Sequence, residues 1–244
     1  MSPLNRRRLA IFKANHRGMV SLVIFCLLFL LSLFAEVIAN DKPILVLFEG
    51  QILFPVFTAY PETHFGGEFP TEADYKDPYV MELVQAKGNA VWPPIHYSYD
   101  TVAKSETAER RALTPPSKAH WLGTDDQSRD VVARLIYGFR TAVLFGLVLT
   151  LFSGVIGVTA GAVQGFFGGW IDLGFQRFME IWQSLPTLYL VIILSSVIRI
   201  SFWWLLGILL LFSWTRYVGV VRAEFLRARN LDFVRAARAL GVSD

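Results

Sequence analysis

Four long apolar runs constrain the fold of this 244-residue chain more than any other feature. They cover roughly residues 19–39, 141–166, 174–198 and 201–221. Each is long enough to cross a hydrocarbon core of about 30 Å, which takes about 20 residues of helix. With 54% hydrophobic residues and a positive mean hydropathy, the chain does not fit a water-soluble fold. We therefore predict an all-α polytopic membrane protein.

The first run follows basic residues, as the core of a secretion signal does. Its apolar core of about 20 residues exceeds the roughly 7–15 of a signal peptide, and "AEVIANDKP" is a weak cleavage site. We interpret the run as a retained anchor. The single cysteine, Cys26, lies inside it, so we expect neither an intrachain disulfide nor a cysteine metal site.

Positive charge flanks the apolar region on both sides, and short cationic flanks tend to stay in the cytoplasm. The basic residues are Arg6, Arg7, Arg8, Lys13 and Arg17 before the first run, and Arg222, Arg227, Arg229, Arg235 and Arg238 after the fourth. An even number of spans between the two flanks agrees with both lying inside. The predicted segments are cytoplasmic 1–18, transmembrane 19–39, external 40–139, three transmembrane helices within 140–221, and cytoplasmic 222–244.

The external segment is acidic, with fourteen Asp and Glu against nine Lys and Arg between Asp41 and Arg134. Structureless connections beyond about 15 residues are uncommon, so we expect a small folded insertion. In "PILVLFEGQILFPVF", two β-branched and aromatic runs around Glu49-Gly50-Gln51 predict a hairpin. Residues 60–116 are rich in Pro, Tyr, Asp and Glu, and are expected to be irregular but ordered by their aromatic side chains. The insertion either caps a pore or docks an external partner.

Small residues recur every four positions in the second run, at Ser153, Gly157, Gly161 and Gly165. Such rows let another helix backbone approach closely within lipid, so we predict that these glycines pack helices together. A second row is formed by Gly146, Thr150 and Gly154.

In the third run, "MEIWQSLPTLY" places Pro186 well inside apolar sequence, where it kinks a helix and frees backbone carbonyls. The neighbouring polar residues are Gln183, Ser184 and Thr187. They either satisfy the freed carbonyls or line a translocation pathway. Arg177 and Glu180, three residues apart, are expected to pair on one helical face.

The sequence lacks the motifs that ATP binding, nucleophilic catalysis and metal binding require. There is no Gly-x-x-x-x-Gly-Lys-Ser/Thr phosphate loop and no nucleophile elbow, and the four histidines are scattered without metal-ligand spacing. Catalysis and resident cofactors are therefore not expected. Basic flanks beside four membrane spans are better explained by anionic headgroups or a protein than by nucleic acid.

The stretch "HWLGTDDQSRDVVARLIYGFR" resembles the start of the membrane permeases of bacterial ABC importers for dipeptides, oligopeptides and nickel. The matching residues are Leu122, Gly123, Thr124, Asp125, Arg129, Asp130, Val131, Arg134, Gly138 and Arg140. Ser128 replaces the usual glycine, so the turn there is expected to differ. The resemblance continues through "GFFGGWID" and "RFMEIWQSLP", covering residues 120–244 strongly and 1–39 loosely.

The closing "DFVRAARALGVSD" resembles the family's cytoplasmic Glu-Ala-Ala…Gly loop, which forms a short coupling helix in a groove of the ATPase subunit. The residues expected to couple to the ATPase are Asp232, Phe233, Arg235, Ala236, Ala237, Leu240 and Gly241. An i, i+3, i+4, i+7 apolar stripe predicts about eight helical residues here, with Asp232 as N-cap and Gly241 as C′ stop. Arg235 stands where the family has Glu, and we hypothesise that it meets an acidic group on the ATPase.

The resemblance implies a type I ABC importer permease bundle that forms a pathway for peptides across the bacterial inner membrane, with its N-terminus cytoplasmic. Implied partners are a second homologous permease, cytoplasmic ATPases that hold ATP and Mg, a periplasmic solute-binding protein and membrane lipids. The family has six spans, so two further helices are expected after the coupling loop. The long insertion looks most like the branch implicated in uptake of oligopeptides and the peptide-nucleotide microcin C.

Two alternative functions are an ion-coupled secondary transporter and a membrane-anchored sensor or scaffold. The first needs ionisable groups near the bilayer midplane and often repeated halves, and neither is visible in the sequence. In the second, the external segment is the receptor and the Arg-rich end binds lipid.

Overall fold

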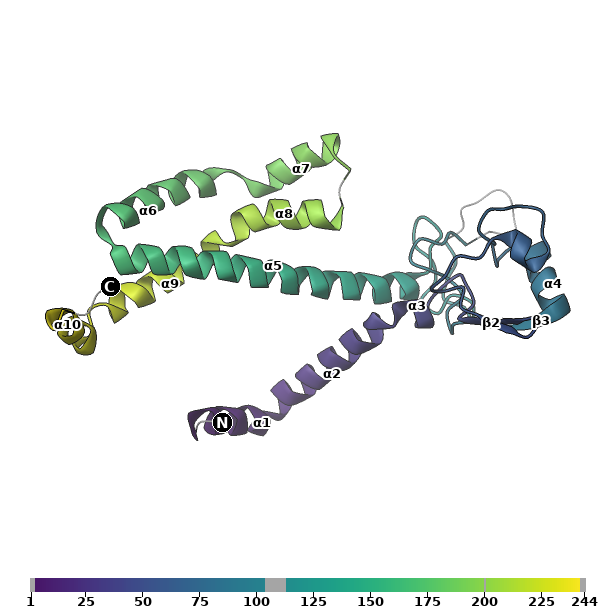
Figure 1. Cartoon of the computed structure of the whole chain (residues 1–244), viewed down its shortest axis with the longest axis horizontal. Coiled ribbons are helices and arrows are strands. Elements are labelled where there is room, and N and C mark those ends of the chain that lie inside the picture. Colours follow the sequence, from purple (N-terminus) through teal and green to yellow (C-terminus); the bar gives the residue numbers. More distant parts are fainter. Residues whose placement is uncertain (1–2, 104–112, 200, 242–244) are drawn as a thin grey trace. The chain divides into compact units, whose positions relative to one another are not determined.

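The computed structural model describes residues 3–103, 113–199 and 201–241 (Figure 1). Residues 104–112 of the predicted insertion and 242–244 of the predicted coupling segment lie outside the described residues. The chain splits into two compact units, Met1–Ala142 and Val143–Asp244, and each is treated by itself.

The first unit begins with helices α1 (Pro3–Ala14), α2 (His16–Leu33) and α3 (Ala35–Ile38). Asn15 separates α1 from α2 and caps the latter, since its side-chain oxygen accepts from the Gly18 N–H at 3.1 Å. The large apolar side chains of α2 are mostly exposed, as expected of a helix that faces lipid. The predicted span 19–39 is thus α2 followed by the short α3.

A three-stranded antiparallel sheet in the order β2-β1-β3 forms the insertion, from β1 (Leu45–Phe48), β2 (Gln51–Leu53) and β3 (Gly88–Val91). The predicted β1–β2 hairpin is confirmed. Glu49 and Gly50 both have positive φ, +48° and +80°, as a two-residue type I′ turn requires.

The prediction that residues 60–116 are irregular is wrong in part. This region contains the 3-10 helix η1 (Glu62–Phe65), α4 (Pro78–Lys87) and β3. Asp77 caps α4 ahead of Pro78, a start signal that is visible in the sequence. The buried core is formed by Val46, Phe48, Leu53, Phe65, Ala73, Tyr75, Val80 and Val84.

Helix α5 (Val131–Phe167) is 37 residues long and begins ten residues before the predicted second run. The extra turns have a cap, because the Asp130 carboxylate accepts from the Ala133 N–H at 2.9 Å. Hydropathy does not predict these turns, because they contain Arg134 and Arg140.

The second unit continues with α6 (Gly169–Ser184), α7 (Thr187–Val197), α8 (Phe202–Ser213), α9 (Thr215–Ala228) and α10 (Asp232–Ala239). The third apolar run is not one straight helix, because α6 and α7 meet at a 60° bend. Over the described residues, three helices are long and apolar enough to cross a membrane, or four if the bent pair is one span. This count agrees with the four predicted runs.

Candidate functional site

The small-residue row on α5 lies against α9. A Cβ added at Gly161 would sit 2.8 Å from the Val218 carbonyl oxygen, and one at Gly165 would sit 2.5 Å from the Phe225 Cβ. At Gly157 it would overlap the carbonyl of Trp214. Close backbone approach therefore requires glycine along this interface. At Gly146 and Gly154, in the second row, no described atom lies within 4 Å of such a Cβ.

An ion pair between α6 and α9 lies near the Gly168-Gly169 turn. The Arg222 guanidinium donates to both Asp172 oxygens at 2.5 and 2.6 Å, and Asp172 is 9% exposed. A bidentate geometry of this kind fixes two helices in one register. This pair was not predicted from the sequence, although Asp172 three residues after Gly169 and Arg222 at the inner basic flank were available signals.

The bend between α6 and α7 lies at Leu185 and Pro186, as the proline predicts. Of the three polar neighbours, Ser184 donates its hydroxyl to the Ile181 carbonyl at 2.6 Å. Gln183 and Thr187 instead line a pocket within the second unit. One neighbour thus satisfies a carbonyl beside the bend, and the other two face open space.

A second helix break faces this bend. Helices α8 and α9 meet at Trp214, a break in the helix at which the backbone angles stay helical (φ −62°, ψ −31°). The Leu211 carbonyl there accepts two indole N–H groups. These come from Trp182 on α6 at 2.8 Å and from Trp214 at 2.9 Å. Trp182 also stacks between Phe178 and Phe212, with ring centroids 5.5 Å apart on each side. Trp182 was missed because the pairing depends on a break in a helix distant in sequence.

The pocket between these two breaks has a volume of about 910 Å³. Its lining combines apolar side chains with polar ones, which are Gln183, Thr187, Ser213, Thr215 and Arg216. Extended backbone at membrane depth, as at Leu185 and Pro186, is tolerated where it is buried in protein or lines a cavity. Two breaks beside one pocket are also typical of substrate sites in membrane transporters. This pocket is therefore the best candidate for a translocation site.

Helix α10 contains the residues expected to couple to an ATPase. Phe233 is 71% exposed and Leu240 is 85% exposed, so the apolar stripe is largely uncovered in this chain. Gly241 has φ of +80°, the left-handed conformation of a C′ stop. Asp232 is the first helical residue rather than the predicted N-cap, because hydrogen bonding already begins at the Leu231 carbonyl. Ala236 is exposed and Ala237 half-buried.

Arg235 is exposed on α10 and donates to the Asn230 side-chain oxygen at 3.2 Å. This is a contact to a neutral amide, so the guanidinium charge is not neutralised by it. The hypothesis of an acidic partner for Arg235 thus remains open to test.

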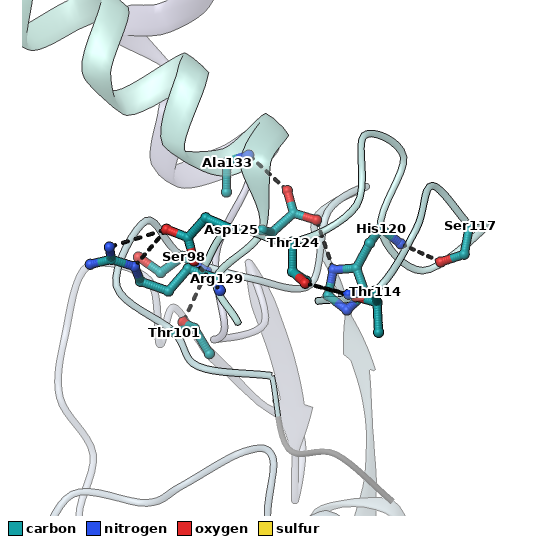
Figure 2. Close-up of polar contacts among 10 residues, drawn as sticks. Ser98, Thr101, Thr114, Ser117, His120, Thr124, Asp125, Arg129 and Ala133 are labelled. Carbon is teal, nitrogen blue, oxygen red and sulfur yellow. Dashed lines mark hydrogen bonds and ion pairs between the residues drawn. The ribbon is translucent and has the colours of Figure 1, made fainter. Parts of the chain in front are cut away.

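The loop before α5 is organised around Asp125 (Figure 2). Its carboxylate accepts from the backbone N–H groups of Gln127 and Arg129 at 2.9 and 2.8 Å, and it pairs with the Arg129 and Arg134 side chains. Burial by itself would raise the pKa of Asp125, but these hydrogen bonds outweigh it and lower the pKa to about 2. Asp125 is therefore a structural anchor that holds this loop.

A buried histidine completes the same loop. His120, labelled in Figure 2, has its Nδ1 2.9 Å from the carboxylate of Asp130, the residue that caps α5. The centroids of the His120 and Tyr97 rings lie 4.4 Å apart. The described contacts of this pair order the start of α5. Over the described ranges, no group of three His, Cys, Asp or Glu is arranged to hold a metal ion.

Arg140 on α5 forms an ion pair with Glu36 on α3, at the end of the first predicted span. Its guanidinium donates to both Glu36 oxygens at 2.8 Å, a bidentate ion pair. Tyr137, one turn earlier, donates its hydroxyl to the Ala39 carbonyl at 3.0 Å. These contacts attach α3 to the start of α5 within the first unit.

Comparisons with known proteins place the chain among transport proteins. Residues 153–244 match the model of the binding-protein-dependent transport system inner membrane component, and residues 2–65 match that of the N-terminal TM domain of oligopeptide transport permease C. The chain is 52% identical to the peptidoglycan transport system permease protein YejE of Agrobacterium fabrum, with 100% of this chain and 69% of that protein aligned.

Two further relatives extend the comparison. The inner membrane ABC transporter permease protein YejE of Escherichia coli is 51% identical, with 100% of this chain and 71% of that protein covered. The dipeptide transport system permease protein DppC of Bacillus subtilis is 35% identical over 54% of this chain and 42% of its own length.

Proposed function

Because the chain belongs to the family of inner membrane components of binding-protein-dependent transport systems, we propose that it lines the path by which peptides cross the bacterial inner membrane. It is a permease subunit of an ABC importer and a multi-pass inner membrane protein. The peptide class is supported by the oligopeptide and dipeptide permeases among its relatives. Peptides released from the cell wall are further candidates, because one relative is named for peptidoglycan transport.

The pocket between the two helix breaks is the observation that carries this proposal. Its volume of about 910 Å³ lies within the roughly 300–1,000 Å³ of ligand pockets. The walls come from α6 to α9, so movement of either broken helix would change its shape. Mixed apolar and neutral polar lining suits peptides, which present both kinds of group.

Helix α10 is the proposed contact to the ATPase. Its exposed Phe233 and Leu240 form a short apolar stripe, and helices with such stripes bind in hydrophobic grooves of partner proteins. In the proposed assembly, two ATPase chains hold ATP and Mg, a second permease completes the pathway, and a solute-binding protein delivers peptide. The proposed orientation places the N-terminus and α10 in the cytoplasm, in line with the basic flanks.

Reconstitution into vesicles tests the function. The permease, its permease partner, both ATPases and the binding protein are combined, and uptake of a labelled oligopeptide is measured. Uptake is expected only with ATP and all components present. Uptake driven by a proton gradient without ATP would support a secondary transporter, and no uptake of any peptide would favour the sensor or scaffold.

A further inference from the structure

Arg216 is the one charged residue that lines the pocket between the two helix breaks in the described part of the chain. It lies in the first turn of α9, two residues after the break at Trp214. No hydrogen bond or ion pair joins it to any residue that the structure describes, whereas Arg222 on the same helix is bound by Asp172. Arg216 is therefore a cation without a protein partner inside a membrane-spanning segment.

Such a position is costly for an arginine. Ionisable residues within membrane spans almost always pair, face a water-filled cavity or reach the interface by extending along the helix. Arg222 is six residues nearer the end of the span, so Arg216 lies about 9 Å deeper along the helix. Arg216 lines the pocket, so water in the pocket can solvate its guanidinium. Keeping this charge inside the span still costs free energy, which binding of an anion would offset.

Two neutral polar groups share the pocket with Arg216. Gln183 lies near the end of α6, and Thr187 begins α7. Neither side chain makes a hydrogen bond within the described structure, so both can bind a ligand. Ser213 and Thr215 differ, because their hydroxyls already donate to backbone carbonyls at 2.7 and 2.8 Å. The unsatisfied groups thus comprise one cation and two neutral hydrogen-bonding side chains, with no carboxylate in the lining.

We propose that Arg216 binds the carboxylate of the transported peptide, the C-terminal one in a peptide without acidic side chains. This inference rests on the proposed peptide transport. A guanidinium matches a carboxylate with two parallel hydrogen bonds. The Gln183 amide, which both donates and accepts, is suited to the last peptide group of the same ligand. A peptide's ammonium end finds no anionic partner in this lining, so the pocket distinguishes the two ends of a peptide.

The test measures ATP-driven uptake of tri-alanine and of its C-terminal amide by the complete importer in vesicles. Both peptides are supplied at concentrations that saturate the binding protein. Wild-type permease is expected to transport the acid about tenfold faster than the amide. This is the factor that corresponds to the loss of one charge-assisted hydrogen bond. Arg216→Gln is expected to bring this ratio to about one, while Arg216→Lys keeps part of it because the charge remains.

Arg227→Gln is the matched control, because Arg227 is an exposed arginine on α9 that does not line the pocket. It should keep the wild-type ratio. Co-purification of the ATPases shows that each variant assembles. A ratio that Arg216→Gln leaves unchanged, or a wild-type importer that takes up both peptides equally, overturns the proposal. If the wild type transports neither these nor any longer peptide, the proposed function fails instead.

Discussion

At the scale of single residues, Ser128 holds a backbone conformation that glycine adopts more easily. Its φ is +61°, its side chain is buried, and its hydroxyl has no described hydrogen-bond partner. The left-handed region costs a non-glycine residue about 1 kcal/mol or more. Ser128→Gly should therefore raise the free energy of unfolding by about 1 kcal/mol, measured by denaturant titration in detergent.

Ser128→Ala separates the two possible causes of that gain. It removes the unpartnered hydroxyl but keeps a side chain at positive φ. Alanine should yield clearly less stabilisation than glycine. Equal gains from both variants would mean that the buried hydroxyl, and not the backbone, is responsible.

Asp125 makes the stability of the same loop depend on pH. Its pKa is about 2 in the folded chain against a usual value of 3.8, so its contribution is complete above about pH 4 and is lost as the pH falls through about 2. Asp125→Asn should lower the free energy of unfolding at pH 7 by about 2 kcal/mol, and the difference should shrink below pH 4. Unfolding titrations at pH 7, 4 and 3 measure it.

The neighbouring Asp126 provides the control for that experiment, because its side chain is exposed. Asp126→Asn should change the stability little at any of the three pH values. A loss that is the same for Asp125→Asn at pH 7 and pH 3 would contradict the assignment to the ionised carboxylate.

At the scale of elements, the contact between α5 and α9 depends on the absence of side chains. Gly161→Ala places a methyl group 2.8 Å from the Val218 carbonyl and 2.9 Å from the Val221 Cβ, so the helices must separate. Overpacking of this kind costs about 1–3 kcal/mol. Gly154→Ala, on the same helix but with no described atom within 4 Å, should be neutral or slightly stabilising. Thermal unfolding in detergent compares the two, and equal effects would exclude this packing.

The ion pair between α6 and α9 is a second contact at this scale. Asp172→Asn and Arg222→Gln each leave one charge partly buried, so each should destabilise by about 2 kcal/mol. In the double variant neither charge remains, and the combined loss should be smaller than the sum. A double-mutant cycle on the free energy of unfolding measures this coupling, and strictly additive losses would show that the pair does not hold the two helices together.

At the scale of the whole molecule, the hypothesis for Arg235 is that it contributes to binding of the ATPase. It is exposed on α10, and among the described residues its side chain donates to Asn230. If it meets an acidic group on the ATPase, Arg235→Glu should weaken ATPase binding about tenfold and lower transport in step. Binding is measured with purified subunits. Arg7→Glu, an equal charge change on exposed α1, should have little effect, and intact binding and transport for Arg235→Glu would disprove the hypothesis.

Much of the architecture was predictable because its causes are local. Four apolar runs predict the spans, Glu49-Gly50 predicts the hairpin turn, and Pro186 predicts the bend. The i, i+3, i+4, i+7 stripe predicts α10 to within a residue at its start. Each of these depends on residues within a few positions of one another, where steric limits and helical periodicity decide the outcome.

The sequence by itself therefore determined which segments are apolar enough to span a membrane, where the third apolar run bends and that α10 carries an apolar stripe. Only the tertiary structure decided which helix the glycine row contacts, that Asp172 pairs with Arg222, and that Trp182 binds the carbonyl freed at the second break. It also left Arg216 at the edge of a pocket, with no hydrogen-bond or ion-pair partner among the residues that the structure describes. The physical reason is that these contacts join residues 29 to 60 or so positions apart. Hydropathy and periodicity describe one segment at a time, and carry no information about which distant surface a side chain meets.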